Sequence, residues 1–279
     1  MRRRVVCRLL PLVLLAATVN GVRGDDDQSW VGRDVLARSV RFQPRAGGRV
    51  SSRSIVCVRT VKQAKGDWLA VGDGWMRRSE VVPVEEAIAW FTNQIERRPT
   101  AFDYVSRAAA RSACGDYEGA ASDCSEALRV SPRFYTAYYH RAAARSEQGR
   151  FEEAVRDYDA ALRLNPALAG AYVDRGAAKL ELGNYPGSLS DVNRALRLSP
   201  RNPDAYYVRG VARYHLHQYG GAVGDLNYAL RAKPDRAVAY DVRGACKQEL
   251  GQLDAARTDF DKAVELDPTI ASARRDKLR

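Results

Sequence analysis

The chain is poor in the residues that carry most enzyme and metal chemistry. Its 279 residues include three histidines, five cysteines and two methionines. His215 and His217 are two positions apart on a predicted helix and so lie on different faces, and His140 lies far from both along the chain. No cysteine spacing of a zinc site, glycine-rich phosphate loop, metal-binding helix motif or nucleophile elbow is present. The sequence therefore predicts no enzymatic activity, no metal ion and no cofactor.

Long apolar runs are also missing, apart from one short stretch near the N-terminus. Three arginines (residues 2–4) precede an apolar run from Leu9 to Val19, and small or polar residues follow as far as Gly24. This order is typical of a secretory signal peptide, and a run of about 11 residues is too short for a comfortable permanent span. We expect residues 1–24 to be a signal peptide, the protein to be periplasmic or extracellular, and no permanent membrane span to remain after cleavage. An uncleaved N-terminal anchor is the alternative.

Acidic residues are scarce in the segment that follows the signal. Residues 28–82 hold eleven Lys or Arg against four acids, whereas the rest of the chain is nearly neutral. This basic module is a candidate for binding an anionic cell-wall or membrane polymer, and a solvated basic surface without a ligand is the alternative. Predicted export and the nearly neutral remainder argue against nucleic acid as a partner.

The basic module also has the pattern of short β-strands. Runs with period-two character are separated by glycine-containing turns. The stretches 66–71, 74–76 and 80–82 are similar to bacterial SH3-like domains, and this resemblance implies a small all-β SH3-like barrel over residues 28–82. The module contains no tyrosine, so an aromatic groove for proline-rich peptides is not expected. Trp68 and Trp75 are expected in the barrel core.

The chain has one pattern in abundance, a 34-residue repeat present five times over residues 101–270. In every copy the fourth place is Tyr, the seventh Arg, the twenty-third Asp, the twenty-seventh Ala and the thirty-second Pro. Each copy has the pattern of two helices, joined by a turn that has Gly in four copies and His217 in the fourth. Such periodicity predicts stacked units that bury their apolar faces against one another. The five copies are residues 101–134, 135–168, 169–202, 203–236 and 237–270.

This pattern resembles the tetratricopeptide repeat (TPR) family, with small residues at the eighth and twentieth places and Pro at the thirty-second. The resemblance implies a mainly α fold, a right-handed TPR α-solenoid of five helix-turn-helix repeats. Residues 83–100 are expected to form a leading helix that caps the first face, and residues 271–279 a polar C-terminal cap. His217 predicts local strain or a shifted turn in the fourth repeat.

One departure from the family pattern is regular, because the seventh place holds Arg where a large aliphatic residue is usual. It always occurs with an Asp sixteen residues later. The pair is expected either within each hairpin or between the Asp of one repeat and the Arg of the next, with bidentate geometry. We interpret this ladder as structural, since the acids would neutralise the arginines; a row of arginines that binds an acidic ligand is the alternative. Its members are Arg107, Asp123, Arg141, Asp157, Arg175, Asp191, Arg209, Asp225, Arg243 and Asp259.

The resemblance also implies that the first helix of each repeat lines the hollow side of the array. The second, fifth, sixth, ninth, twelfth and thirteenth places would face it, and tyrosine and aliphatic residues dominate there, which suits an extended peptide or an apolar helix. The Lys and Asn clamp of the chaperone-tail-binding relatives is absent. The candidate partner-binding residues are Phe102, Val105, Tyr139, His140, Val173, Asp174, Tyr207, Tyr214 and His215.

These observations predict a non-catalytic protein–protein interaction scaffold in the cell envelope, with protein or peptide ligands. The competing hypothesis is an envelope-anchoring protein whose basic SH3-like domain binds an anionic polymer.

Overall fold

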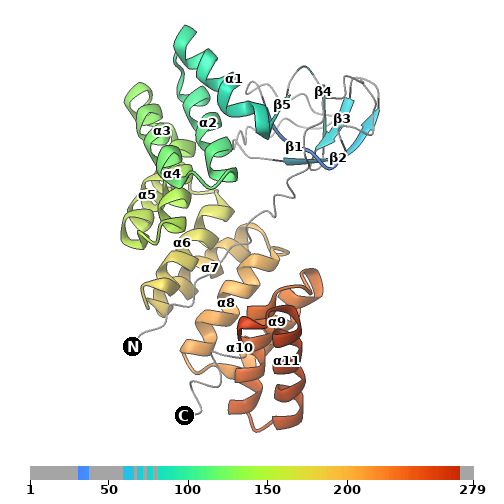
Figure 1. Cartoon of the computed structure of the whole chain (residues 1–279). Helices are drawn as coiled ribbons and strands as arrows, with labels where there is room; N and C mark the ends of the chain where they lie inside the picture. The colour runs from blue at the N-terminus through green and yellow to red at the C-terminus, as the bar shows by residue number, and fades with distance from the viewer. Residues whose placement is uncertain are drawn as a thin grey trace. The chain divides into compact units, whose positions relative to one another are not determined.

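The computed structural model describes residues 31–37, 59–65, 68–71, 74–77, 79 and 81–270 (Figure 1). The expected signal peptide (1–24) and C-terminal cap (271–279) lie outside these residues. No helix among the described residues is both long and apolar enough to cross a membrane. The chain divides into two compact units, whose described parts fall within residues 31–164 and residues 165–270.

Each repeat of residues 101–270 is one antiparallel helical hairpin, so the mainly α repeat fold predicted from the sequence is confirmed. In the first unit a leading helix, α1 (Val84–Arg97), comes before two hairpins, and in the second unit there are three hairpins. The hairpins of the first unit are α2 (Ala101–Ala113) with α3 (Tyr117–Val130) and α4 (Tyr135–Glu147) with α5 (Phe151–Leu164). Those of the second unit are α6 (Ala169–Glu181) with α7 (Tyr185–Leu198), α8 (Pro203–His215) with α9 (Tyr219–Ala232), and α10 (Ala237–Glu249) with α11 (Leu253–Leu266).

The hairpins turn at the fifteenth place of the repeat, where the backbone is left-handed. The glycines there have φ between 74° and 82°, and His217 adopts the same conformation with φ 59°. Gln218 N–H donates to the Arg213 carbonyl at 2.8 Å, as Asn184 N–H does to Lys179 in the preceding hairpin, so the turn at His217 is not shifted. Of the two expectations, strain is the one observed, because a left-handed conformation costs a residue with a Cβ about 1–2 kcal/mol.

The N-terminal strands form one five-stranded antiparallel sheet. Its order is β4-β3-β2-β1-β5, so that β1 pairs with both β2 and β5, and β2 carries an irregularity between Val61 and Gln63. The bounds are β1 (Asp34–Ala37), β2 (Arg59–Lys65), β3 (Trp68–Val71), β4 (Gly74–Arg77) and β5 (Val81–Pro83). Trp68 and Trp75 lie in β3 and β4, and their side chains lie outside the described residues, so their expected core position stays a prediction.

The sheet buries two apolar faces, as the alternation of side chains along a strand requires. One residue from each strand contributes to the first core: Val35, Val61, Leu69, Met76 and Val81. The next residues along β1 and β5, Leu36 and Val82, point the other way and join a second core with Ala87, Phe91, Val105 and Ala109 of α1 and α2. Arg33 also pairs with Glu85 at the start of α1. The sheet and the leading helix therefore share one core.

Candidate partner-binding surface

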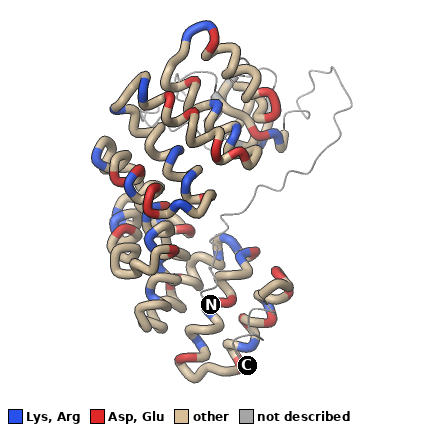
Figure 2. The backbone as a smooth tube through the Cα atoms, turned by 60° about the vertical axis from the view of Figure 1, so that its left-hand side comes forward, with Lys and Arg blue, Asp and Glu red and all other residues tan. Residues whose placement is uncertain are grey.

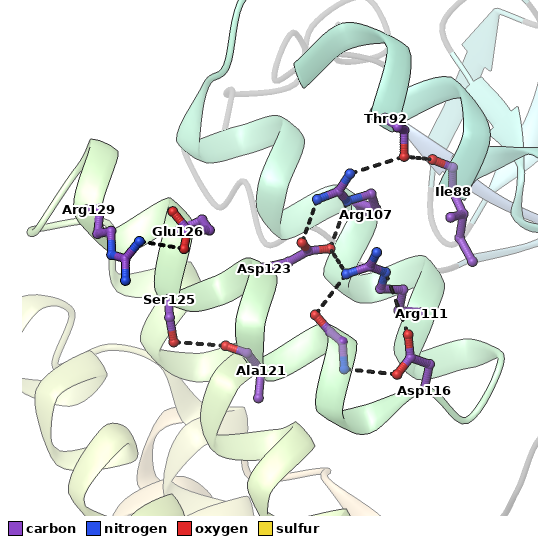
Figure 3. Close-up of polar contacts among 11 residues, drawn as sticks. Ile88, Thr92, Arg107, Arg111, Asp116, Ala121, Asp123, Ser125, Glu126 and Arg129 are labelled. Atoms are coloured by element: carbon purple, nitrogen blue, oxygen red, sulfur yellow. Dashed lines mark hydrogen bonds and ion pairs between the residues drawn. The ribbon is translucent and has the colours of Figure 1, made fainter. Parts of the chain in front are cut away.

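The arginine at the seventh place bonds to the aspartate of its own hairpin. Arg107 donates from Nε and Nη2 to the two carboxylate oxygens of Asp123 at 2.9 and 2.7 Å (Figure 3). The same bidentate pair joins Arg141 to Asp157, and the five aspartates are all 5% exposed or less. Of the two arrangements that the spacing allowed, the structure thus has the one within the hairpin. The other three pairs are Arg175–Asp191, Arg209–Asp225 and Arg243–Asp259.

A second cation, not predicted from the sequence, shares each of these carboxylates. It stands at the eleventh place, one helical turn after the arginine, and its nitrogen lies 2.6 to 3.0 Å from the aspartate. The sequence did contain an indication of it, because this place holds Arg or Lys in all five copies. Each aspartate therefore holds two cations together at the hairpin interface. The residues are Arg111, Arg145, Lys179, Arg213 and Lys247.

In Arg107, Arg141, Arg209 and Arg243 the remaining donor of the guanidinium bonds to the preceding helix. Arg107 Nη1 donates to Thr92 Oγ1 of α1 at 3.1 Å (Figure 3), and Arg209 Nη1 donates to Asn193 Oδ1 of α7 at 3.2 Å. Each of the five guanidinium groups also lies 5.1 to 5.8 Å from the ring of the fourth-place tyrosine. The bond to Asp225 outweighs burial and raises the pKa of Arg209. These arginines are committed to internal contacts, which argues against the row of arginines that would bind an acidic ligand.

The face of the first helices that points away from these ion pairs has no basic residue. We define the first-helix face as the second, fifth, sixth, ninth, twelfth and thirteenth places of α2, α4, α6, α8 and α10. None of these thirty positions is Lys or Arg, and six are acidic, although the chain carries 45 basic residues. Figure 2 shows acidic and basic residues interspersed along the helices. The acids are Glu147, Asp174, Glu181, Asp204, Asp241 and Glu249.

The structure divides the predicted partner-binding residues into two groups. Val105, Val173 and Tyr207 are 0%, 5% and 7% exposed, so they pack the interior and are not available to a partner. For Val105 the reason is the sheet, whose Leu36 and Val82 share its core. The other six are half-buried and stay candidates: Phe102, Tyr139, His140, Asp174, Tyr214 and His215.

In the second unit, two of these candidates belong to a larger aromatic cluster. The rings of His215 and Tyr185 stack in parallel with centroids 4.3 Å apart, and the ring of Tyr214 lies 5.1 Å from that of His215. Tyr219 lies 6.1 Å from Tyr214, and its hydroxyl is hydrogen-bonded to Nδ1 of His217 at 2.7 Å. Tyr185 and Tyr219 stand at the seventeenth place of their repeats, and neither was among the predicted partner-binding residues. The cluster therefore combines residues from α7, α8, α9 and the α8–α9 turn.

A smaller aromatic group forms in the first unit. The ring of Tyr139 lies 5.4 Å from that of His140 and 5.9 Å from that of Tyr158. Within the described parts of the chain, no group of three or more His, Cys, Asp or Glu side chains could hold a metal ion. The arrangement offers aromatic and carboxylate contacts, which suit recognition.

Comparison with known proteins agrees with the hairpin geometry. Profiles described as Tetratricopeptide repeat match residues 184–243 and 237–270, and a profile described as TPR repeat matches residues 143–183. No curated protein matches the chain.

Several solved structures share the fold. One is YrrB, "a TPR protein with an unusual peptide-binding site", which is 22% identical with a TM-score of 0.55 over 68% of this chain and 98% of YrrB. The fragment "MamA 41-end" from Desulfovibrio magneticus RS-1 is 20% identical with a TM-score of 0.52, over 66% of this chain and 97% of that fragment. A chain of the APC/C hetero-tetramer Cut9–Hcn1 is 18% identical with a TM-score of 0.59, over 66% of this chain and 37% of that chain. Residues 143–270 therefore consist of tetratricopeptide repeats, and the helices of this protein have the TPR fold.

Proposed function

We propose that the protein is a non-catalytic adaptor that binds peptide or helical segments of partner proteins on its first-helix face. The observation that supports this proposal most strongly is that each hairpin has two kinds of position, with different contacts. The repeated charged residues bond to one another between the paired helices, while the first-helix face keeps half-buried aromatic and apolar side chains that differ between copies. The residues that repeat in every copy thus hold the paired helices together, and the residues that differ between copies determine which partner binds.

The composition of this face supports a peptide or helix as the ligand. Tyrosine supplies a large contact area at low entropic cost, and stacked repeats offer an extended surface along which a segment can lie. Half-buried small residues at the ninth place, Ala177 and Ala245, leave the helix backbone close to this surface. The peptide-binding site of YrrB is a property of that protein, and it adds support for this class of ligand.

For the N-terminal sheet we propose an SH3-like arrangement that acts as a cap. The pairing of β1 with both β2 and β5, and the shared core of all five strands, support this arrangement. The cap covers Phe91 and Val105, which would otherwise be an exposed apolar end of the array. The competing role, as an anchor on an anionic polymer, rests on charge alone, since residues 28–82 hold eleven basic residues against four acids. Location in the cell envelope is supported by the signal-like sequence of residues 1–24.

A peptide-library selection on the full chain tests the adaptor proposal. The expected result is an enriched peptide motif whose binding, measured by fluorescence anisotropy, is lost in the variants Ala177→Arg and Ala245→Arg. Ser190→Arg, which places the same side chain on an exposed position of α7, is the matched control and should bind normally. Enrichment of no motif, or binding that survives both first-helix variants, would contradict the proposal.

A further inference from the structure

We propose that the aromatic cluster of Tyr185, Tyr214, His215 and Tyr219, flanked by Asp241 and Glu249, receives a cationic side chain, Arg or Lys, of the bound peptide. The inference rests on the proposed function, because it names the chemistry of the partner segment that would lie on the same face. The site would prefer a basic partner segment, whereas a clamp made of basic residues prefers an acidic one.

The rings form a chain of contacts that runs from Tyr185 through His215 and Tyr214 to Tyr219. Tyr185 begins α7, Tyr214 and His215 end α8, and Tyr219 begins α9, so helix ends from two hairpins converge there. The ring centroids of neighbours in this cluster are 4.3 to 6.1 Å apart. The face of a tyrosine ring attracts a cation within about 6 Å of its centroid, and the attraction increases when the cation is desolvated. A guanidinium entering this region would contact more than one ring.

Two acids, Asp241 and Glu249, lie on α10. This helix packs against both α8 and α9. Burial raises the pKa of Tyr219, and among the charges that raise it further Glu249 is the largest. Burial likewise raises the pKa of Tyr214, with smaller contributions from several neighbours that include Glu249 and Asp241. Both acids are thus close enough to act electrostatically on the cluster, and they would attract a cation bound at the rings.

The basic residues nearest in sequence are engaged elsewhere. Arg213 donates from Nη1 to Asp225 at 2.7 Å, and Lys247 Nζ lies 2.9 Å from Asp259, both on the side of the helix that faces its partner. Since the first-helix face itself has no Lys or Arg, an incoming cation would meet rings and carboxylates without a basic side chain of that face to repel it.

The equivalent places in the first unit lack this combination. There the seventeenth places hold Tyr117 and Phe151, but the twelfth and thirteenth places of the second repeat are Ser146 and Glu147 instead of two aromatic rings. The site is therefore a property of repeats three to five and is not a general consequence of the repeat.

Paired labelled peptides and the full-length chain test this inference at about pH 8, with anisotropy as the readout. The probe is a fluorescein-labelled peptide of alternating Arg and Ala, compared with the same peptide containing citrulline, which keeps the shape of Arg without its charge. We expect the citrulline peptide to bind roughly tenfold more weakly. Glu249→Gln should weaken binding of the Arg peptide by about threefold, whereas Glu152→Gln, an exposed acid of α5, should leave it unchanged.

A second pair of variants separates a role of the ring from a role in folding. Tyr214→Phe keeps the aromatic face and should retain most of the affinity, while Tyr214→Leu should lose about fivefold. Equal binding of the Arg and citrulline peptides, failure of the Arg peptide to bind, or equal effects of Glu249→Gln and Glu152→Gln would overturn the inference. In each case the adaptor proposal would still be decided by the library selection, which uses peptides of every charge.

Discussion

Asp225 should be far more important to stability than the arginine that it binds. The carboxylate is 4% exposed and accepts three bonds, two from Arg209 at 2.9 and 2.7 Å and one from Arg213 at 2.7 Å. In Asp225→Leu, two cations remain at one interface without their counter-charge. Removing one member of a buried pair costs about 3–5 kcal/mol, and the lower value applies because the Arg213 side chain is 27% exposed.

The reciprocal change is expected to be milder. In Arg209→Leu the carboxylate keeps its bond to Arg213, and the new side chain is of the apolar kind usual at this place in TPR sequences. The bonds to Asp225 and Asn193 and the contact with the Tyr206 ring are lost, for a net cost of about 1–2 kcal/mol. In the double variant Arg209→Leu/Asp225→Leu only Arg213 is left unpaired, so it should be about 1–2 kcal/mol more stable than Asp225→Leu alone.

Urea unfolding at about pH 7, followed by far-UV circular dichroism, measures these differences. Hydrogen exchange of α8 and α9 should accompany it, because repeat arrays depart from two-state behaviour and the loss is expected to be local. Asp235→Leu is the control, since this exposed acid should change stability by less than about 0.5 kcal/mol. Equal costs for the two single variants, or a double variant less stable than Asp225→Leu, would refute the view that one acid holds two cations.

Three further predictions concern the acid response, the cap and the fourth turn. Burial would raise the pKa of Asp259, but the bonds from Arg243 and Lys247 outweigh burial and lower the pKa. The contribution of Asp259 to stability is therefore complete above about pH 4, and it is lost as the pH falls through the pKa of the folded state. Asp259→Asn should therefore flatten the loss of urea midpoint below that pH; an unchanged slope would contradict this. Phe91→Ala, at the fully buried contact between the cap and α1, should cost about 3–5 kcal/mol by the same measurement, and a loss below 1 kcal/mol would show that the cap is not packed there. His217→Gly should be about 1 kcal/mol more stable than His217→Ala, because both variants lose the bond to Tyr219 and only alanine keeps the left-handed strain; the reverse order in thermal unfolding would exclude strain.

The sequence was sufficient for features that repeat and insufficient for those that depend on contacts outside the repeat. The sixteen-residue spacing of Arg and Asp predicted that they pair, and it left open whether the pair lies within one hairpin or between neighbouring repeats; the structure has the first arrangement. It did not show that Val105 is buried, because the cover comes from Leu36, which no periodic pattern relates to the first hairpin. The aromatic cluster was half predicted, from Tyr214 and His215, because Tyr185 and Tyr219 lie outside the first helices, to which the predicted binding places were confined. A helix pattern indicates which face a side chain is on, and it does not indicate which rings from other hairpins meet there.

The backward bonds of Arg107, Arg141, Arg209 and Arg243 all point toward the N-terminal end of the array. Arg243 Nη1 donates to Asn227 Oδ1 of the preceding hairpin at 2.8 Å, as Arg141 Nη1 does to Ser125 Oγ. Removing the last hairpin frees a neutral acceptor that water can satisfy, whereas removing a preceding hairpin deprives a partly buried guanidinium of an acceptor, which costs more. Fraying from the C-terminal end is therefore cheaper than opening from the N-terminal end, where Thr92 accepts from Arg107 and the sheet covers α1. Further hairpins could therefore be added after the last one without leaving a buried guanidinium that lacks an acceptor.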